Sequence, residues 1–170
     1  EKKKFNFNLI FKLIKKNFNT KKITIAGYYP SDNEVNILQF LEQAFKRKFR
    51  IALPVIKSSG DMSFKSWIYK EPLSVNSFGI LEPKNSKTEL IPDLILVPLV
   101  AYDRNLNRIG YGKGYYDRIL KKIKKNKNFF LSLGMAYSFQ KCDNIPADKH
   151  DVKLNYIFTE QGIISSNSKI

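Results

Sequence analysis

A short stretch of the chain combines glycines, two cations and a carboxylate in a pattern suited to binding a phosphate group. Glycines let another molecule approach the backbone closely, and consecutive N–H groups of such a loop form an anion-binding concavity. Arginine can fork onto a phosphate, and lysine adds a point charge. A carboxylate beside a phosphate costs energy unless a cation such as Mg²⁺ separates them. The residues are Arg108, Gly110, Gly112, Lys113, Gly114 and Asp117. They predict a site for a nucleotide phosphate and a metal ion.

The segments on either side place this loop between a strand and a helix. Leu94–Val97 is a short apolar run between two prolines, which is typical of a buried strand in the centre of a sheet. A turn region with Asp103, Asn105 and Asn107 follows, and a helix is predicted to begin near Tyr115. The helix would add its free N–H groups and its dipole at the loop. The glycine spacing matches neither the Walker pattern nor the dinucleotide fingerprint, so an ordinary glycine-rich turn is the alternative.

The rest of the chain alternates predicted strands and helices. Strands are predicted at 23–29, 49–54, 62–69, 129–136 and 156–159, and helices at 1–22, 34–44 and 115–125. This alternation predicts an α/β fold, a three-layer α/β/α sandwich with a mostly parallel central sheet. Ligands of such sheets bind at the carboxyl ends of the strands, where the glycine loop begins. Without a repeat or linker, residues 1–170 are predicted to form a single domain. The loop-rich segment 74–89 is a candidate lid.

The amino-acid composition indicates which binding partners and which cellular compartment to expect. The net charge is +15, but 25 lysines stand against 5 arginines, whereas nucleic-acid recognition favours arginine. We therefore expect no nucleic-acid partner, and a basic RNA-binding domain is kept as an alternative. Cys142 is the only cysteine, which indicates a reducing, cytoplasmic location. No apolar run approaches the roughly 20 residues of a membrane span.

The first 22 residues predict an amphipathic helix. Its apolar side chains recur at three- and four-residue steps, and it carries eight lysines. We expect the apolar stripe to pack on the sheet, with the lysines in solvent; a helix lying on a membrane surface is the less favoured alternative. The stripe consists of Phe7, Ile10, Phe11, Ile14 and Phe18. Because the chain begins at Glu1 rather than methionine, we expect residues upstream of it.

The run PLVAYDRNLNRIGYGKGYYDR, residues 98–118, resembles the signature of the 5-formyltetrahydrofolate cyclo-ligase (methenyltetrahydrofolate synthetase) family. It departs mildly, with Ile109 where leucine is usual and Leu99 where glycine is common. Further segments resemble the family in the same order, and together they span about residues 23–160. These segments are Tyr28-Tyr29-Pro30 with Asn33-Glu34-Val35, then Phe78-Gly79-Ile80-Leu81-Glu82-Pro83, then Ile145-Pro146 and His150-Asp151.

The resemblance implies an ATP- and Mg²⁺-dependent ligase. It would convert 5-formyltetrahydrofolate, possible polyglutamylated forms included, to 5,10-methenyltetrahydrofolate with release of ADP and phosphate. The formyl oxygen would be phosphorylated, and N10 would close the ring. By resemblance, the catalytic residues are Arg108 and Lys113, and Mg²⁺ is held by Asp117 and Asp151. ATP is bound by Arg108, Gly110, Gly112, Lys113, Gly114, Tyr115 and Tyr116, and the folate by Tyr29, Glu34, Tyr111, Gly112, Lys113, Gly114 and Tyr115.

Several readings stay open at this point. Trp67 is a candidate folate contact, although aromatic residues at strand spacing more often belong to a core. Glu34 can equally be a carboxylate favoured by the first turn of a helix. Family members carry an N-terminal arm whose lysine and arginine contact ATP, and too little sequence precedes Ile23 to supply all of it. The alternative is therefore a relative that binds folate and nucleotide with impaired catalysis. We expect a monomer in either case.

Overall fold

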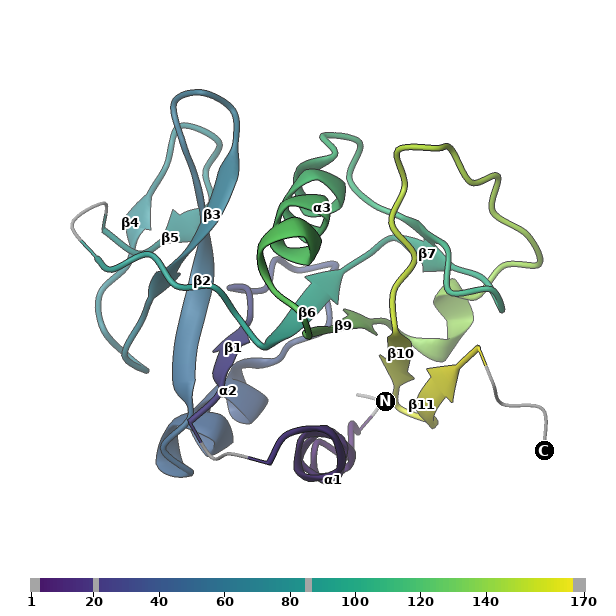
Figure 1. Ribbon diagram of the computed structural model, residues 1–170, viewed down its shortest axis with the longest axis horizontal. Coiled ribbons are helices and arrows are strands. Elements are labelled where there is room, and N and C mark those ends of the chain that lie inside the picture. Colours follow the sequence, from purple (N-terminus) through teal and green to yellow (C-terminus); the bar gives the residue numbers. More distant parts are fainter. Residues whose placement is uncertain (1–3, 20–21, 85–86, 167–170) are drawn as a thin grey trace.

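The central element of the protein is a seven-stranded sheet (Figure 1). The computed structural model describes residues 4–19, 22–84 and 87–166. The strand order is β11-β10-β9-β6-β1-β2-β3, and only the pairs at the two edges, β10–β11 and β2–β3, are antiparallel. The strands are β1 (Thr24–Ala26), β2 (Arg50–Ile56), β3 (Met62–Ser66), β6 (Leu94–Pro98), β9 (Leu131–Met135), β10 (Tyr156–Thr159) and β11 (Gly162–Ser165). The mostly parallel sheet is the predicted one.

Helices cover both faces of this sheet. In Figure 1, α1 and α2 lie on one side and α3 lies on the other. The helices are α1 (Asn8–Asn17), α2 (Leu38–Lys46) and α3 (Tyr115–Asn126), with a short 3-10 helix η1 (Ser138–Gln140). Two small hairpins are added, β4 (Ser74–Val75) with β5 (Leu81–Glu82) and β7 (Ala101–Tyr102) with β8 (Arg108–Ile109). The predicted α/β/α sandwich is confirmed. No helix within the described ranges has the length and apolar character that a bilayer crossing requires.

Strand β6 shows why the sheet forms where the sequence predicts it. All five of its residues are buried, and it lies between β1 and β9. Leu94 and Leu96 face the core cluster that contains the buried side chains of α1 and α2. Ile95 and Val97 face the other cluster, which contains the buried side chains of α3. A strand buried on both faces reads as a continuous apolar run, and this run with its flanking prolines identified the strand from the sequence.

Several predicted boundaries are wrong, among them those of the N-terminal helix, which was predicted at 1–22 and is α1 at Asn8–Asn17 in the described residues. Helix α2 begins at Leu38 and not at Glu34, because the Asn36 side chain accepts the Leu38 N–H at 3.0 Å and opens the helix there. The chain also forms a strand beyond 159 that was not predicted: Gly162, at φ +131°, completes a turn with Thr159 and brings β11 back along β10. The outermost parts of the predicted N-terminal helix, residues 1–3 and 20–21, lie outside the described residues.

Candidate active site

A cavity of about 800 Å³ opens at the carboxyl ends of β1, β2 and β6. Its wall includes Tyr28 just after β1, Pro54 near the end of β2 and Pro98 at the end of β6. All the residues that the sequence analysis assigned to the site line this cavity, with the exception of Trp67. The tertiary structure thus brings together segments that are separated by more than 100 residues in the chain.

The glycine loop forms one side of the cavity and leads into α3. Gly112 and Gly114 have φ values of +85° and +65°, a region that favours glycine. Gly114 is also the N-cap residue directly before α3, so the unpaired N–H groups of the first turn lie at the loop. A Cβ atom at Gly114 would lie 3.0 Å from Nη1 of Arg118, which donates to the Lys113 carbonyl at 2.9 Å. The loop therefore has the positive end of a helix dipole and a backbone shape that only glycine adopts easily.

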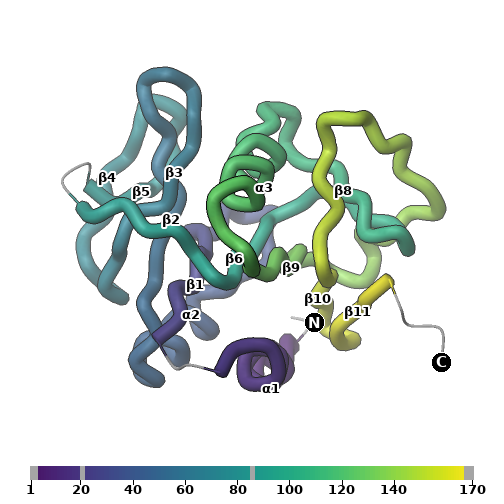
Figure 2. The backbone as a smooth tube through the Cα atoms, viewed as in Figure 1, coloured from purple at the N-terminus to yellow at the C-terminus, as the bar shows by residue number. Residues whose placement is uncertain are grey.

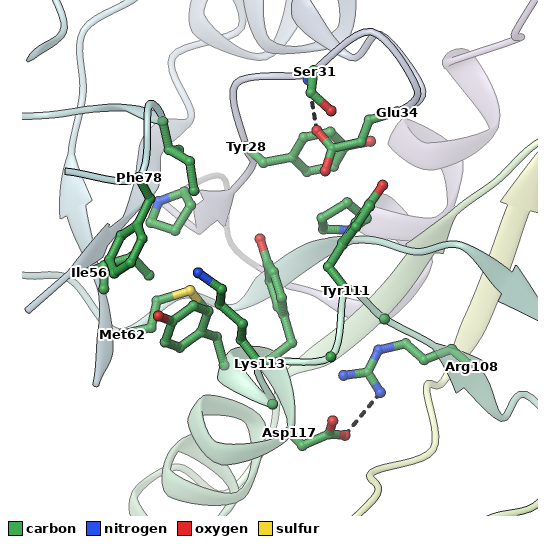
Figure 3. A pocket seen from close by; sticks show the side chains of 18 of the residues that line it. Tyr28, Ser31, Glu34, Ile56, Met62, Phe78, Arg108, Tyr111, Lys113 and Asp117 are labelled. Atoms are coloured by element: carbon green, nitrogen blue, oxygen red, sulfur yellow. Dashed lines mark hydrogen bonds and ion pairs between the residues drawn. The ribbon is translucent and has the colours of Figure 1, made fainter. Parts of the chain in front are cut away.

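The Lys113 side chain contacts an aromatic ring of the cavity wall (Figure 3). Its Nζ is 4.0 Å from the centre of the Phe78 ring, a cation–π contact. Phe78 belongs to the turn between β4 and β5, where its N–H donates to Asn76 Oδ1 at 2.9 Å. Glu82 fixes this hairpin by accepting hydrogen bonds from Asn76 Nδ2 and from the Ile56 N–H of β2. The candidate lid segment thus contains an ordered hairpin that carries Phe78 to the cavity.

Arg108 and Asp117 form an ion pair behind the glycine loop. The Arg108 side chain is only 4% exposed, and its Nη1 donates to Asp117 Oδ1 at 2.9 Å and to the Val152 carbonyl at 3.3 Å. The same Oδ1 atom accepts the Val152 N–H at 2.9 Å. Strand β8, helix α3 and the segment before β10 are therefore joined by this pair. Asp117, the carboxylate that was expected beside the phosphate, is therefore paired with Arg108.

Glu34 lies among tyrosines on the opposite side of the cavity (Figure 3). Its Oε2 accepts the Ser31 N–H at 2.8 Å, which holds the turn in which it lies. Partial burial, and then the Glu34 carboxylate, raises the pKa of Tyr111 to about 12. Burial followed by the same carboxylate also raises the pKa of Tyr116 and of Tyr28, whose hydroxyl donates to the Val35 carbonyl at 2.9 Å. These phenols therefore stay protonated at neutral pH and act as hydrogen-bond donors, not bases.

Asp117 and Asp151 both reach the cavity, as the prediction of a magnesium site requires. Asp151 Oδ2 accepts the Asp148 N–H at 2.8 Å. The other carboxylate oxygens, Oδ2 of Asp117 and Oδ1 of Asp151, accept no hydrogen bond from the described part of the chain. Within that part, no group of three or more His, Cys, Asp or Glu side chains could hold a metal alone. Mg²⁺ needs only one or two carboxylates when phosphates and waters supply its other ligands. The donor set fits such a shared site.

Trp67 is placed differently from the prediction. It is 6% exposed in the core under the sheet, its Nε1 donates to the Glu71 carbonyl at 3.0 Å, and it does not line the cavity. The apolar wall is formed instead by side chains not assigned to the site from sequence, among them Ile56, Met62 and Phe78. Strand periodicity shows which residues share a face of the sheet, but it does not show which face meets the cavity.

Known proteins resemble this chain over most of its length. A model of the 5-formyltetrahydrofolate cyclo-ligase family matches residues 2–160. The chain is 33% identical over 136 residues to the 5-formyltetrahydrofolate cyclo-ligase of Haemophilus influenzae, covering 76% of this chain and 72% of that protein. It is 35% identical to the cyclo-ligase of Mycoplasma pneumoniae, covering 81% and 73%. The solved 5,10-methenyltetrahydrofolate synthetase of Aquifex aeolicus is 28% identical, with a TM-score of 0.72 over 96% of this chain and 82% of that one. The chain belongs to the 5-formyltetrahydrofolate cyclo-ligase family.

Proposed function

We propose that this cyclo-ligase uses ATP and Mg²⁺ to convert 5-formyltetrahydrofolate to 5,10-methenyltetrahydrofolate, releasing ADP and phosphate. The observation that carries the proposal is the shared cavity. A glycine loop with two cations, two carboxylates and the separate carboxylate of Glu34 all line one space of about 800 Å³. Cavities of that size are at the upper end for small-molecule sites, as a folate together with a nucleotide would require.

The chemistry explains why a phosphate site should lie beside a folate site. A formamide oxygen is a poor nucleophile and a poor leaving group, so N10 cannot displace it unaided. Transfer of the γ-phosphoryl group of ATP to the formyl oxygen makes it a leaving group. N10 then attacks the formyl carbon and loses its proton, the C–O bond breaks, and phosphate departs with the oxygen and can carry that proton away. For the first step the protein mainly positions the groups and stabilises charge.

The glycine-loop side of the cavity suits the triphosphate. Backbone N–H groups at Gly112 and Gly114, together with the Lys113 ammonium, would surround its oxygens. Arg108 would contribute the N–H groups that do not bind Asp117 and Val152. Asp117 and Asp151 would hold Mg²⁺, which would supply positive charge to the phosphates. A bridging cation would also reduce the repulsion between these carboxylates and the nucleotide.

The opposite side suits the folate. Glu34 would accept hydrogen bonds from the amino group and ring N–H of the pterin, a donor pair that a carboxylate matches well. Tyr29 and Tyr111 also line the cavity, and the apolar wall with Phe78 would contact the flat ring system. No general base of the protein is needed if the departing phosphate takes the N10 proton, which agrees with phenols that remain protonated. We further propose a cytoplasmic monomer without nucleic-acid or membrane partners.

An ultraviolet assay tests the proposal directly. The purified chain is mixed with 5-formyltetrahydrofolate and Mg-ATP, and the absorbance of the methenyl product is followed while ADP is measured in parallel. We expect product and ADP in equal amounts, and neither when ATP or Mg²⁺ is left out. Binding of both ligands without product would identify a relative with impaired catalysis. Product without ATP consumption would reject the phosphorylation step.

A further inference from the structure

Asp103 is a completely buried carboxylate that does not itself line the cavity. Its Oδ1 accepts the N–H groups of Asn105 and Asn107 at 2.9 and 3.0 Å. Its Oδ2 accepts Nδ2 of Asn107 at 2.9 Å and the N–H of Ile145 at 3.1 Å. Burying a carboxylate is costly unless it is fully hydrogen-bonded, and these four bonds meet that requirement. Oδ1 accepts bonds only from within the turn, whereas Oδ2 accepts one bond from the turn residue Asn107 and one from Ile145 across the fold.

The two segments that Asp103 joins both form the cavity wall. On one side, it closes the β7–β8 hairpin, in which Tyr102 pairs with Arg108, and β8 leads directly into the glycine loop. On the other side, Ile145 and the following Pro146 line the cavity. Figure 2 shows the β7–β8 region beside the loop that leads to β10, and the Cys142 N–H donates to the Tyr102 carbonyl at 2.8 Å. The bond to Ile145 extends this contact to the cavity wall.

The bond to Ile145 is not needed to close the hairpin. The turn has its own backbone bonds, from the Asp103 N–H to the Asn107 carbonyl and from the Leu106 N–H to the Asp103 carbonyl. Oδ1 adds two more within the turn. By contrast, Ile145 lies 42 residues further along the chain. Oδ2 accepts Nδ2 of Asn107 within the turn, and its second bond, to this distant N–H, adds nothing to the closure of the turn.

We infer that Asp103 is a positioning residue for the nucleotide half of the site, an inference that rests on the proposed binding of ATP at the glycine loop. It sets the spacing between the Arg108 strand and the Ile145 wall. The folate half is held by other contacts, since Glu34 is fixed by the Ser31 N–H and Tyr28 by the Val35 carbonyl. Loss of the Ile145 bond therefore weakens the use of Mg-ATP and leaves folate binding intact.

A charge-matched exchange separates this role from hairpin stability. In the Asp103→Asn/Asn107→Asp double variant, the amide at 103 donates to the carboxylate at 107, which restores the bond within the turn. The Ile145 N–H then faces an amide NH₂ group and loses its acceptor. In Asp103→Asn alone, the Ile145 N–H also faces an NH₂ group, and the bond within the turn is kept only if the Asn107 amide turns its oxygen toward residue 103. Steady-state kinetics are measured for each variant with Mg-ATP and with 5-formyltetrahydrofolate as the varied substrate, and thermal unfolding is recorded alongside. Lys113→Ala is the reference for the proposed ATP site.

We expect the double variant to unfold near the wild-type temperature and yet lose about 10- to 100-fold in kcat/KM for Mg-ATP, as misplaced groups do. Its KM for the folate stays within about twofold of wild type, since those contacts are intact. Recovery of wild-type Mg-ATP kinetics in the double variant would overturn the inference, as would equal losses for both substrates or failure of both variants to fold. If Lys113→Ala also leaves Mg-ATP kinetics unchanged, the proposed ATP site is at fault instead.

Discussion

Nη1 of Arg108 and Oδ1 of Asp117 lie 2.9 Å apart, and the backbone of Val152 contacts both side chains. The two residues were assigned from sequence to separate tasks, one to phosphate and one to metal. In the structure they are partners, so the carboxylate is already compensated before any nucleotide binds. This pairing offsets part of the repulsion between an acid and an anion-binding loop. It also makes Arg108 a residue of the fold as well as of the proposed site.

Arg108→Ala is therefore expected to lower the free energy of unfolding. The substitution removes hydrogen bonds to a charged group from a site where Arg108 is 4% and Asp117 21% exposed, which costs about 2 kcal/mol. Urea denaturation at neutral pH measures the change. The matched control is Arg104→Ala: Arg104 is exposed and has no partner among the described residues, so its loss should cost less than about 0.5 kcal/mol. Equal stability of the two variants would contradict the structural role.

Lys113→Ala should reduce turnover by about two to three orders of magnitude, by analogy with the loss of one preorganised donor at a developing charge. The physical reason is that Lys113 is the cation of the glycine loop that faces the cavity. Turnover is measured with the ultraviolet assay at saturating substrates. Lys124→Ala, on the exposed face of α3, is the control for lost surface charge. A variant with nearly wild-type turnover would remove Lys113 from the mechanism.

Asp117→Asn should abolish the Mg²⁺ dependence of ATP binding. A neutral amide is a poor ligand for a hard cation such as Mg²⁺. The substitution also releases Arg108 from its ion pair, so Arg108 can bind ATP in the absence of Mg²⁺. Calorimetric titrations with ATP, in the presence and absence of Mg²⁺, measure the effect. Asp143→Asn serves as a control because Asp143 is exposed and does not line the cavity. Unchanged Mg-ATP affinity in Asp117→Asn would reject its role as a metal ligand.

Glu34→Gln should raise the KM for 5-formyltetrahydrofolate by about 10- to 100-fold, the equivalent of weakened hydrogen bonds to a charged acceptor. The KM for Mg-ATP should stay close to wild type, because the glycine loop is positioned by different contacts. Glu42→Gln is the control, since Glu42 pairs with Lys46 on α2 and does not line the cavity. If the two KM values of Glu34→Gln change together, Glu34 supports the whole site and does not recognise the pterin.

Asp103 should make stability depend on acid pH. Burial would raise the pKa of this carboxyl, but the hydrogen bonds from Asn107, Ile145 and Asn105 outweigh burial and lower it. A depressed pKa in the folded state stabilises the protein above the unfolded value of about 3.9, and the contribution is lost as pH falls through the folded value. The stability difference between wild type and Asp103→Asn should thus be largest near neutral pH and shrink in acid. Urea denaturation of both proteins at neutral and at acid pH checks this. The same difference in the free energy of unfolding under both conditions would contradict it.

The sequence alone determined the features that depend on local backbone preferences. The buried run at Leu94–Val97 and the positive-φ glycines at Gly112 and Gly114 follow from residue type and short-range spacing, and the resulting strand, loop and helix are found where they were predicted. The three-layer arrangement followed from the alternation of such elements, because an amphipathic element has few ways to bury its apolar face. The start of α2, predicted near residue 34, lies at Leu38, whose N–H is bound by the Asn36 side chain.

Only the tertiary structure decided which side chains meet. The pairing of Arg108 with Asp117, the Phe78 ring beside Lys113, and the bond from Asp103 to Ile145 join elements whose relative positions depend on packing of the whole sheet. Trp67 shows the same limit, since its aromatic character suited either a ligand or a core, and its place in the sheet directed it to the core. Long-range contacts of this kind are set by the summed burial of many residues, which no local pattern encodes.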